Sequence, residues 1–180
     1  MQCSTGGEAA AKVLIDLGVE YVFTLTGGHL NHIHLHLENS PVKLIHTHHE
    51  QGATFMADAY GRMTGKPGVA MLTAGPGFTN SLTPIMHAMF CNTPLLVIAG
   101  AAGIEFRDKL DLQDAPQIAT VASMVKKSFV CTQVDRVAEY VEMAYRTAYT
   151  GRPGPVFLEL PCDVLGAAMP KGKTEYYRTN

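Results

Sequence analysis

The sequence has no excess of either charge, and this absence limits its partners. Its 180 residues include 14 lysines and arginines against 16 aspartates and glutamates, which gives a formal net charge of −2. A protein that grips a phosphate backbone needs a basic surface. We therefore expect no nucleic-acid partner.

Long hydrophobic runs are also missing. No stretch reaches the roughly 18 consecutive apolar residues that a membrane span requires. The first residues, MQCSTGGE, do not lead into the apolar core of a signal peptide. We therefore expect a cytoplasmic protein with no membrane partner.

Paired cysteines and the common nucleotide motifs are absent too. The four cysteines, at positions 3, 91, 131 and 162, are widely spaced and form no C-x-x-C pair, so we expect reduced and mostly buried thiols. Gly27-Gly28 does not complete G-x-G-x-x-G, and no G-x-x-x-x-G-K-[ST] occurs. A dinucleotide fingerprint and a P-loop are therefore both excluded.

Hydrophobic residues, at 47%, suffice for the buried core of one domain, and they follow an alternating pattern. The predicted strands are 21–25, 42–47, 68–74, 94–100, 128–131 and 156–160. The predicted helices are 7–17, 29–38, 50–63, 79–90, 116–122 and 134–148.

Runs that are apolar on both faces, between amphipathic helices, are typical of a parallel sheet that helices cover on both sides. We predict an α/β fold with an open, mostly parallel six-stranded sheet and helices on both faces. Residues 1–165 would form the domain and 166–180 a linker or tail.

The residues that could bind a ligand or take part in catalysis follow the ends of four predicted strands. In open α/β sheets, sites gather where strands end, and these ends read TGGH (26–29), HHEQ (48–51), TAGPG (73–77) and GAAG (100–103). The glycines could cradle a flat or anionic group, or could simply form tight turns. The one carboxylate, Glu50, opens a helix, where the helix dipole favours negative charge.

The histidines allow a second interpretation. On a strand, His32, His34 and His36 could form a metal site, but this segment reads better as a helix, which turns His34 away. One hypothesis is a zinc or iron hydrolase that uses Asp58 with some of these histidines or with those of 46–49. Solvated or capping histidines are the other.

Three blocks in order resemble a known family: GGEAAAKVLIDLGVEYVFTLTGG, HEQGATFMADAYGRMTGKPGVAMLTAGPGFTN and GRPGPVFLELPCDVL. They are similar to the amino-terminal, pyrimidine-binding domain of thiamine-diphosphate enzymes of the acetolactate synthase and benzaldehyde lyase group. The resemblance covers about residues 6–165 and implies a flavodoxin-like fold.

The resemblance implies that Glu50 is catalytic. In the family, this glutamate hydrogen-bonds N1′ of the cofactor's aminopyrimidine and promotes the tautomer that removes the thiazolium C2 proton. The cofactor-binding positions that it implies are Gly27, Gly28, Glu50, Thr73, Pro76 and Asn80.

Two further positions match the benzaldehyde-lyase-like branch. His29 and Gln113 would orient the substrate carbonyl or hydroxyl and move protons. The branch often has a second histidine where Thr26 stands, and acetolactate synthases usually lack the histidine at 29. The resemblance therefore favours a lyase or carboligase that acts on 2-keto acids, 2-hydroxyketones or aldehydes.

The chain contains no Gly-Asp-Gly, the start of the family's segment that binds Mg²⁺ and the diphosphate. We expect no metal ligand here, and a diphosphate-binding domain in the same or a partner chain. The chain would be a fragment or a separate subunit, inactive alone; the alternative is a non-catalytic assembly subunit of a split decarboxylase. The family implies a homodimer or tetramer. Met56, Tyr60, Met86 and Met89 would be contact residues or, equally, ordinary core.

Overall fold

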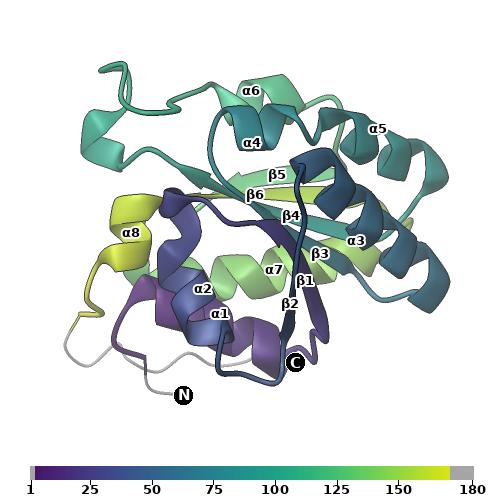
Figure 1. Ribbon diagram of the computed structural model, residues 1–180, viewed down its shortest axis with the longest axis horizontal. Helices are drawn as coiled ribbons and strands as arrows, with labels where there is room; N and C mark the ends of the chain where they lie inside the picture. Colours follow the sequence, from purple (N-terminus) through teal and green to yellow (C-terminus); the bar gives the residue numbers. More distant parts are fainter. Residues whose placement is uncertain (1–2, 171–180) are drawn as a thin grey trace.

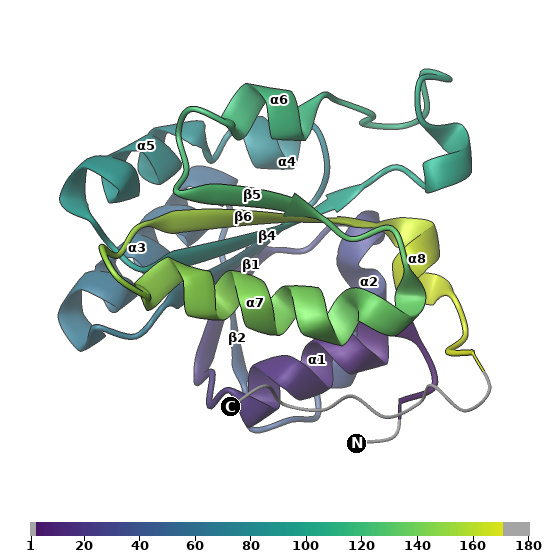
Figure 2. The ribbon, with the colours of Figure 1, turned by 180° about the vertical axis from the view of Figure 1, so that it is seen from behind.

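The computed structural model describes residues 3–170, which contain one six-stranded sheet in the order β2-β1-β3-β4-β6-β5 (Figures 1 and 2). Every neighbouring pair is parallel. The strands are β1 (Tyr21–Leu25), β2 (Lys43–His46), β3 (Gly68–Leu72), β4 (Leu95–Ala101), β5 (Lys127–Val130) and β6 (Pro155–Pro161). The predicted open α/β sheet is confirmed.

Helices cover both faces of this sheet. The α-helices are α1 (Gly6–Asp16), α2 (Asn31–Leu37), α3 (Glu50–Thr64), α4 (Pro76–Thr79), α5 (Leu82–Cys91), α6 (Gln117–Val121), α7 (Val137–Tyr149) and α8 (Cys162–Gly166). The 3₁₀ turns are η1 (Gly28–Leu30), η2 (Ile104–Phe106) and η3 (Val134–Arg136). α1, α2, α7 and α8 lie on one face, and α3 to α6 lie on the other (Figures 1 and 2).

The core forms two apolar layers because strand side chains alternate between the faces. In β1, Val22 belongs to the apolar layer that contains residues of α1 and α7, whereas Phe23 belongs to the layer that contains residues of α3. All residues of β3, β4 and β6 are buried, which explains why these strands read as continuous apolar runs. The edge strands β2 and β5 begin with the exposed lysines Lys43 and Lys127, which discourage pairing with another chain.

The predicted helix 79–90 is wrong in one respect, because the structure divides this region into α4 and α5. Gly75 adopts φ 58°, which turns the chain so that a helix already starts at Pro76. α4 ends at Thr79 with Asn80 as its C-cap, and α5 starts at Leu82. The break has a consequence for the site, since it places the Asn80 side chain against α3.

The end of the described chain contains one element that the sequence did not predict. In α8, Val164 and Leu165 are buried against α1 and α2. Beyond it, Met169 N–H donates to Ser4 O, and Gly6 N–H donates to Ala167 O. Residues 171–180 of the expected linker lie outside the described residues, so the domain boundary stays a prediction.

The cysteines are free, as expected, but only Cys3 and Cys131 are buried. Cys91 is exposed at the end of α5 and Cys162 is half-buried, so the expectation of mostly buried thiols is half wrong. Across residues 3–170, no helix is long and apolar enough to cross a membrane.

Candidate functional site

The site lies where β1 and β3 end. These strands are neighbours, but the chain leaves β1 for β2 on one side and β3 for β4 on the other. Such a topological switch point opens a crevice at the carboxyl ends of the strands. The turns after the two strands meet closely, because a Cβ at Gly27 would lie 2.3 Å from Thr73 Cβ. Glycine at position 27 is therefore required by packing between the two turns.

A buried carboxylate lies at this crevice. Glu50 is the first residue of α3 and is 8% exposed. His49 caps the helix by accepting a hydrogen bond from the Gln51 N–H. Asn80 Nδ2 donates to Glu50 Oε2 over 2.9 Å, whereas Oε1 accepts no hydrogen bond from the described residues. One carboxylate oxygen is thus fixed and the other is available to a ligand.

His29, Thr73 and Gln113 come together beside this carboxylate. His29 Nδ1 and Thr73 Oγ1 are 3.0 Å apart, and Thr73 Oγ1 donates to Gln113 Oε1 over 3.4 Å. His29 also packs on Gly100 at the end of β4, where a Cβ would lie 2.4 Å from His29 Cβ. The structure therefore joins three predicted site residues that are far apart in the sequence.

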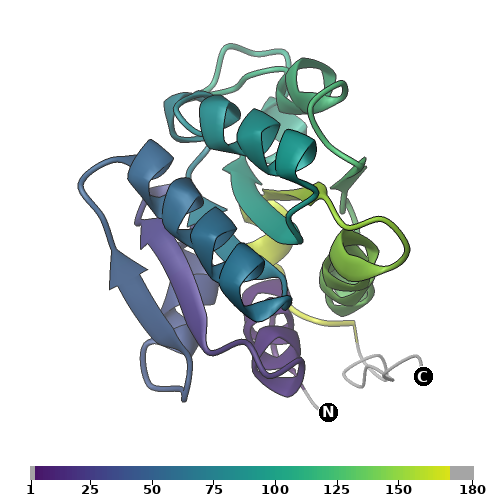
Figure 3. The same cartoon turned by 90° about the vertical axis from the view of Figure 1, so that its right-hand side faces the viewer.

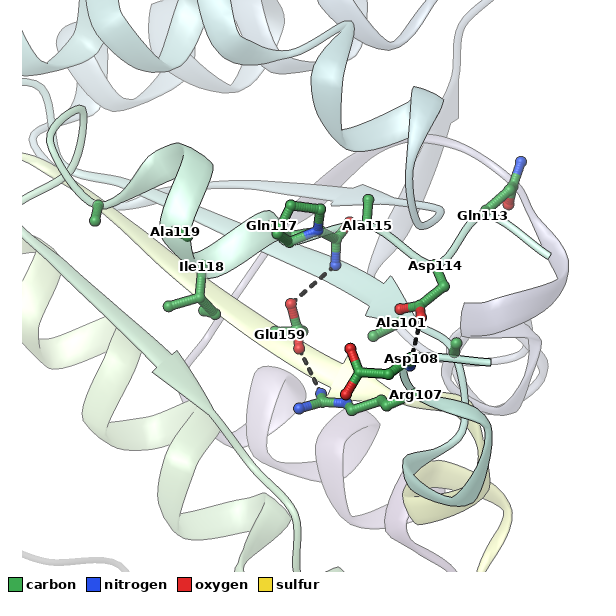
Figure 4. Close-up of a pocket in the computed structure, with 13 residues that line it drawn as sticks. Ala101, Arg107, Asp108, Gln113, Asp114, Ala115, Gln117, Ile118, Ala119 and Glu159 are labelled. Atoms are coloured by element: carbon green, nitrogen blue, oxygen red, sulfur yellow. Dashed lines mark hydrogen bonds and ion pairs between the residues drawn. The ribbon is translucent and has the colours of Figure 1, made fainter. Parts of the chain in front are cut away.

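Gln117, which was not among the predicted site residues, links the turn after β3 to the ends of β4 and β6. Its side chain is buried and fully hydrogen-bonded. Oε1 accepts from Gly75 N–H, and Nε2 donates to Gly100 O and Glu159 Oε2. Arg107 Nη2 donates to the other Glu159 oxygen over 2.5 Å (Figure 4). Gln117 thereby holds the Gly75 turn on which Pro76 is placed.

The loop that carries Gln113 has a strained backbone. Asp108, Leu110 and Gln113 have φ values of 62°, 57° and 61°, which non-glycine residues rarely adopt. The loop is held by Asp108 N–H, which donates to Asp114 Oδ2, and by Gln113, which packs against Gly75. Such strain is common where a loop must present a side chain to a ligand.

The metal-hydrolase hypothesis finds no support in residues 3–170, which contain no group of three His, Cys, Asp or Glu side chains able to hold a metal ion. His34 is buried, with Nε2 3.0 Å from Thr24 Oγ1 and Nδ1 3.1 Å from Leu30 O. Burial lowers the pKa of this histidine. Asp58 pairs with His87, not with any of the histidines considered above.

Comparison with known proteins agrees with this geometry. Residues 4–124 match the family model described as "Thiamine pyrophosphate enzyme, N-terminal TPP binding domain". The chain belongs to this family. The resemblance noted in the sequence is thereby confirmed.

The proteins that are similar to the chain include two kinds of thiamine pyrophosphate enzyme. The 2-hydroxyacyl-CoA lyase 2 of Danio rerio is 41% identical over 160 residues, which cover 89% of this chain and 26% of the relative. The human protein of that name is 40% identical over 163 residues, covering 89% and 25%. The acetolactate synthase large subunit of Buchnera aphidicola subsp. Acyrthosiphon pisum (strain APS) is 35% identical over 166 residues, covering 92% and 29%. The chain thus spans about a quarter of the length of these relatives.

The residues at the crevice fit a thiamine diphosphate ring. A Cβ at Gly28 would meet nothing within 4 Å, so space is open above the turn after β1. At Gly77, a Cβ would lie 3.4 Å from Glu50 Oε1 and 2.7 Å from Thr73 Cγ2. A side chain at position 77 would therefore crowd the available carboxylate oxygen. A small residue there leaves room for a flat ring to reach Glu50.

Proposed function

We propose that this chain forms the pyrimidine-binding half of a thiamine-diphosphate site in a lyase or carboligase. The enzyme would cleave or form C–C bonds in 2-keto acids, 2-hydroxyketones or aldehydes. The observation that supports this most directly is Glu50, a buried carboxylate at a switch point with one oxygen held by Asn80 and one available. Membership of the thiamine pyrophosphate enzyme family supplies the cofactor class.

Glu50 acts by accepting a hydrogen bond from the ring N–H of the pyrimidine at Oε1. A charge-assisted hydrogen bond of this kind is stronger where water is excluded, because the local dielectric is low. Asn80 keeps Oε2 in place, so the carboxylate does not have to reorganise. When bound, thiamine diphosphate would supply the nucleophilic carbon and the electron sink for the carbanion.

His29 and Gln113 are the groups proposed to meet the substrate. If the Thr73 hydroxyl donates to Gln113, then His29 Nδ1–H donates to Thr73, since that oxygen has already given its proton. In the neutral imidazole, Nε2 is then the unprotonated nitrogen and can accept a proton from a substrate hydroxyl. Gln113 keeps an amide N–H₂ that can hold the substrate oxygen.

The chain contributes only part of such an enzyme. We propose that a second domain, in the same or a partner chain, binds the diphosphate through Mg²⁺. We also propose that the chain self-associates through the exposed apolar side chains of α3 and α5. These are Phe55, Met56, Met63 and Phe90. Figure 3 shows the two helices side by side at the surface.

Product analysis with the diphosphate domain present tests the proposal. The chain would be combined with that domain, thiamine diphosphate and Mg²⁺, and offered a 2-keto acid, a 2-hydroxyketone and a 2-hydroxyacyl thioester. We expect aldehyde release from at least one substrate, and a loss on the order of 100-fold in His29→Ala if this histidine moves a proton. The exposed His36→Ala serves as the control.

A stable complex that releases no aldehyde from any of the three substrates would contradict the lyase proposal. If assembly were also indifferent to thiamine diphosphate and to Glu50→Gln, the alternative of a non-catalytic assembly subunit would replace it.

A further inference from the structure

A cavity of about 680 Å³ lies beside Gln113, at the carboxyl ends of β4 and β6 (Figure 4). Its size is within the usual range for pockets that bind small molecules. Much of its wall comes from small or apolar side chains, namely Ala101, Ala102, Ala115, Ile118, Ala119 and Ala122. The cavity thus offers apolar surface, beside polar groups, next to a residue that is proposed to hold the substrate.

The charges around the cavity disfavour an anion. Arg107 is the one basic residue that lines it, and its guanidinium is already bonded to the buried Glu159. The exposed carboxylates of Asp108 and Asp114 also line it. A phosphate or carboxylate entering the cavity would therefore meet net negative charge and no available arginine.

The position of Gln113 connects the cavity to the reacting end of the site. Its Oε1 is 3.4 Å from Thr73 Oγ1, which in turn contacts His29. The same residue lines the cavity. A molecule whose carbonyl lies at His29 can therefore extend past Gln113 into the cavity.

We propose that this cavity binds the uncharged hydrocarbon tail of the carbonyl substrate. The inference rests on the proposed function for the identity of the ligand, but the lining residues on which it is argued are those of this chain. Each methylene that leaves water for an apolar wall contributes about 0.8 kcal/mol. The affinity is therefore expected to rise about two- to fourfold for each added methylene until the cavity is full.

Titration of the ¹⁵N-labelled chain with straight-chain 2-alkanones of four to ten carbons, followed by NMR, tests the proposal. These ketones carry the carbonyl and the tail but need neither cofactor nor catalysis. We expect amide shifts at Ala101, Ala115 and Ala119 and a Kd that falls as the chain lengthens. 2-Alkanones of matching length that carry a carboxylate at the far end of the tail should bind at least tenfold more weakly, because that charge would lie in the cavity.

A matched pair of variants locates the binding. Ala119→Phe fills the cavity from the exposed surface of α6 and should weaken binding of the longest ketones about tenfold. Ala59→Phe adds the same ring to an exposed position of α3, outside the cavity, and should leave the Kd unchanged.

An affinity that is independent of chain length, or equal effects of the two variants, would overturn the proposal, as would ketones with a terminal carboxylate that bind as well as the unsubstituted ketones. The result is separable from the proposed function: ketone binding with no aldehyde release by the assembled enzyme would sink the proposed function alone.

Discussion

At the scale of single residues, Gly27 and Gly28 are adjacent but have different surroundings. A Cβ at Gly27 would overlap Thr73, whereas one at Gly28 would meet nothing within 4 Å. We predict that Gly27→Ala lowers the free energy of unfolding by ~1–3 kcal/mol. The added methyl group would overlap Thr73 Cβ, and because this atom is bonded directly to the backbone, the turn itself would have to move. Gly28→Ala should change it by less than ~0.5 kcal/mol.

Urea unfolding of both variants measures this difference directly. Equal losses of stability would show that the two turns do not pack as described.

The site residues differ in how far the sequence could predict them. Glu50 was predictable because it is the one carboxylate at a strand end and lies in a family motif. Asn80 was assigned only by resemblance, and its contact with Glu50 depends on the break between α4 and α5. Gln117 gave no signal, because a glutamine in a short helix looks the same in sequence whether it is buried and bonded or exposed.

At the scale of elements, the strands and long helices followed their patterns closely. β1 was predicted at its observed bounds, and α3 begins at Glu50 as predicted. The errors fall where local geometry overrides periodicity. The positive φ of Gly75 starts α4 early, and α8 forms because Val164 and Leu165 have a surface on α1 and α2 to cover. Neither cause is visible in a pattern of apolar residues.

The start of α1 yields a prediction with a defined pH dependence. The Lys12 ammonium beside Glu8, and the Ser4 N–H that donates to it, lower the pKa of this carboxyl to about 2. A lowered pKa means that the ionised form stabilises the fold: the contribution is complete above the usual pKa of about 4.5 and is lost as the pH falls towards 2.

Glu8→Gln should therefore destabilise the chain by ~1 kcal/mol at pH 7, through the lost helix-start and ion-pair contacts. In thermal unfolding, the gap in Tm between parent and variant should narrow between pH 4.5 and pH 3. Glu20→Gln, which removes an exposed ion pair with Lys66, should have a smaller effect. A gap that stays constant over this pH range would contradict the assigned role of Glu8.

At the scale of the whole molecule, the apolar surface of α3 and α5 bears on assembly. Phe90 is 77% exposed at the end of α5, and Leu110 is 97% exposed on the strained loop. If α3 and α5 form the contact between copies, Phe90→Asp should lower the mass measured by light scattering towards that of a single chain. Leu110→Asp introduces the same charge elsewhere and should leave the mass unchanged. Equal masses for parent and Phe90→Asp would exclude this face as the contact.

The central claim is that Glu50 activates thiamine diphosphate, and exchange of the cofactor's C2 proton measures it most directly. The chain would be combined with a matching diphosphate domain, thiamine diphosphate and Mg²⁺, and exchange into D₂O followed by NMR. We predict that Glu50→Gln slows exchange on the order of 100-fold or more, because the amide cannot take part in the proton transfer. The exposed control Glu38→Gln should exchange at the parent rate. Equal exchange rates in Glu50→Gln and the parent would contradict the claim.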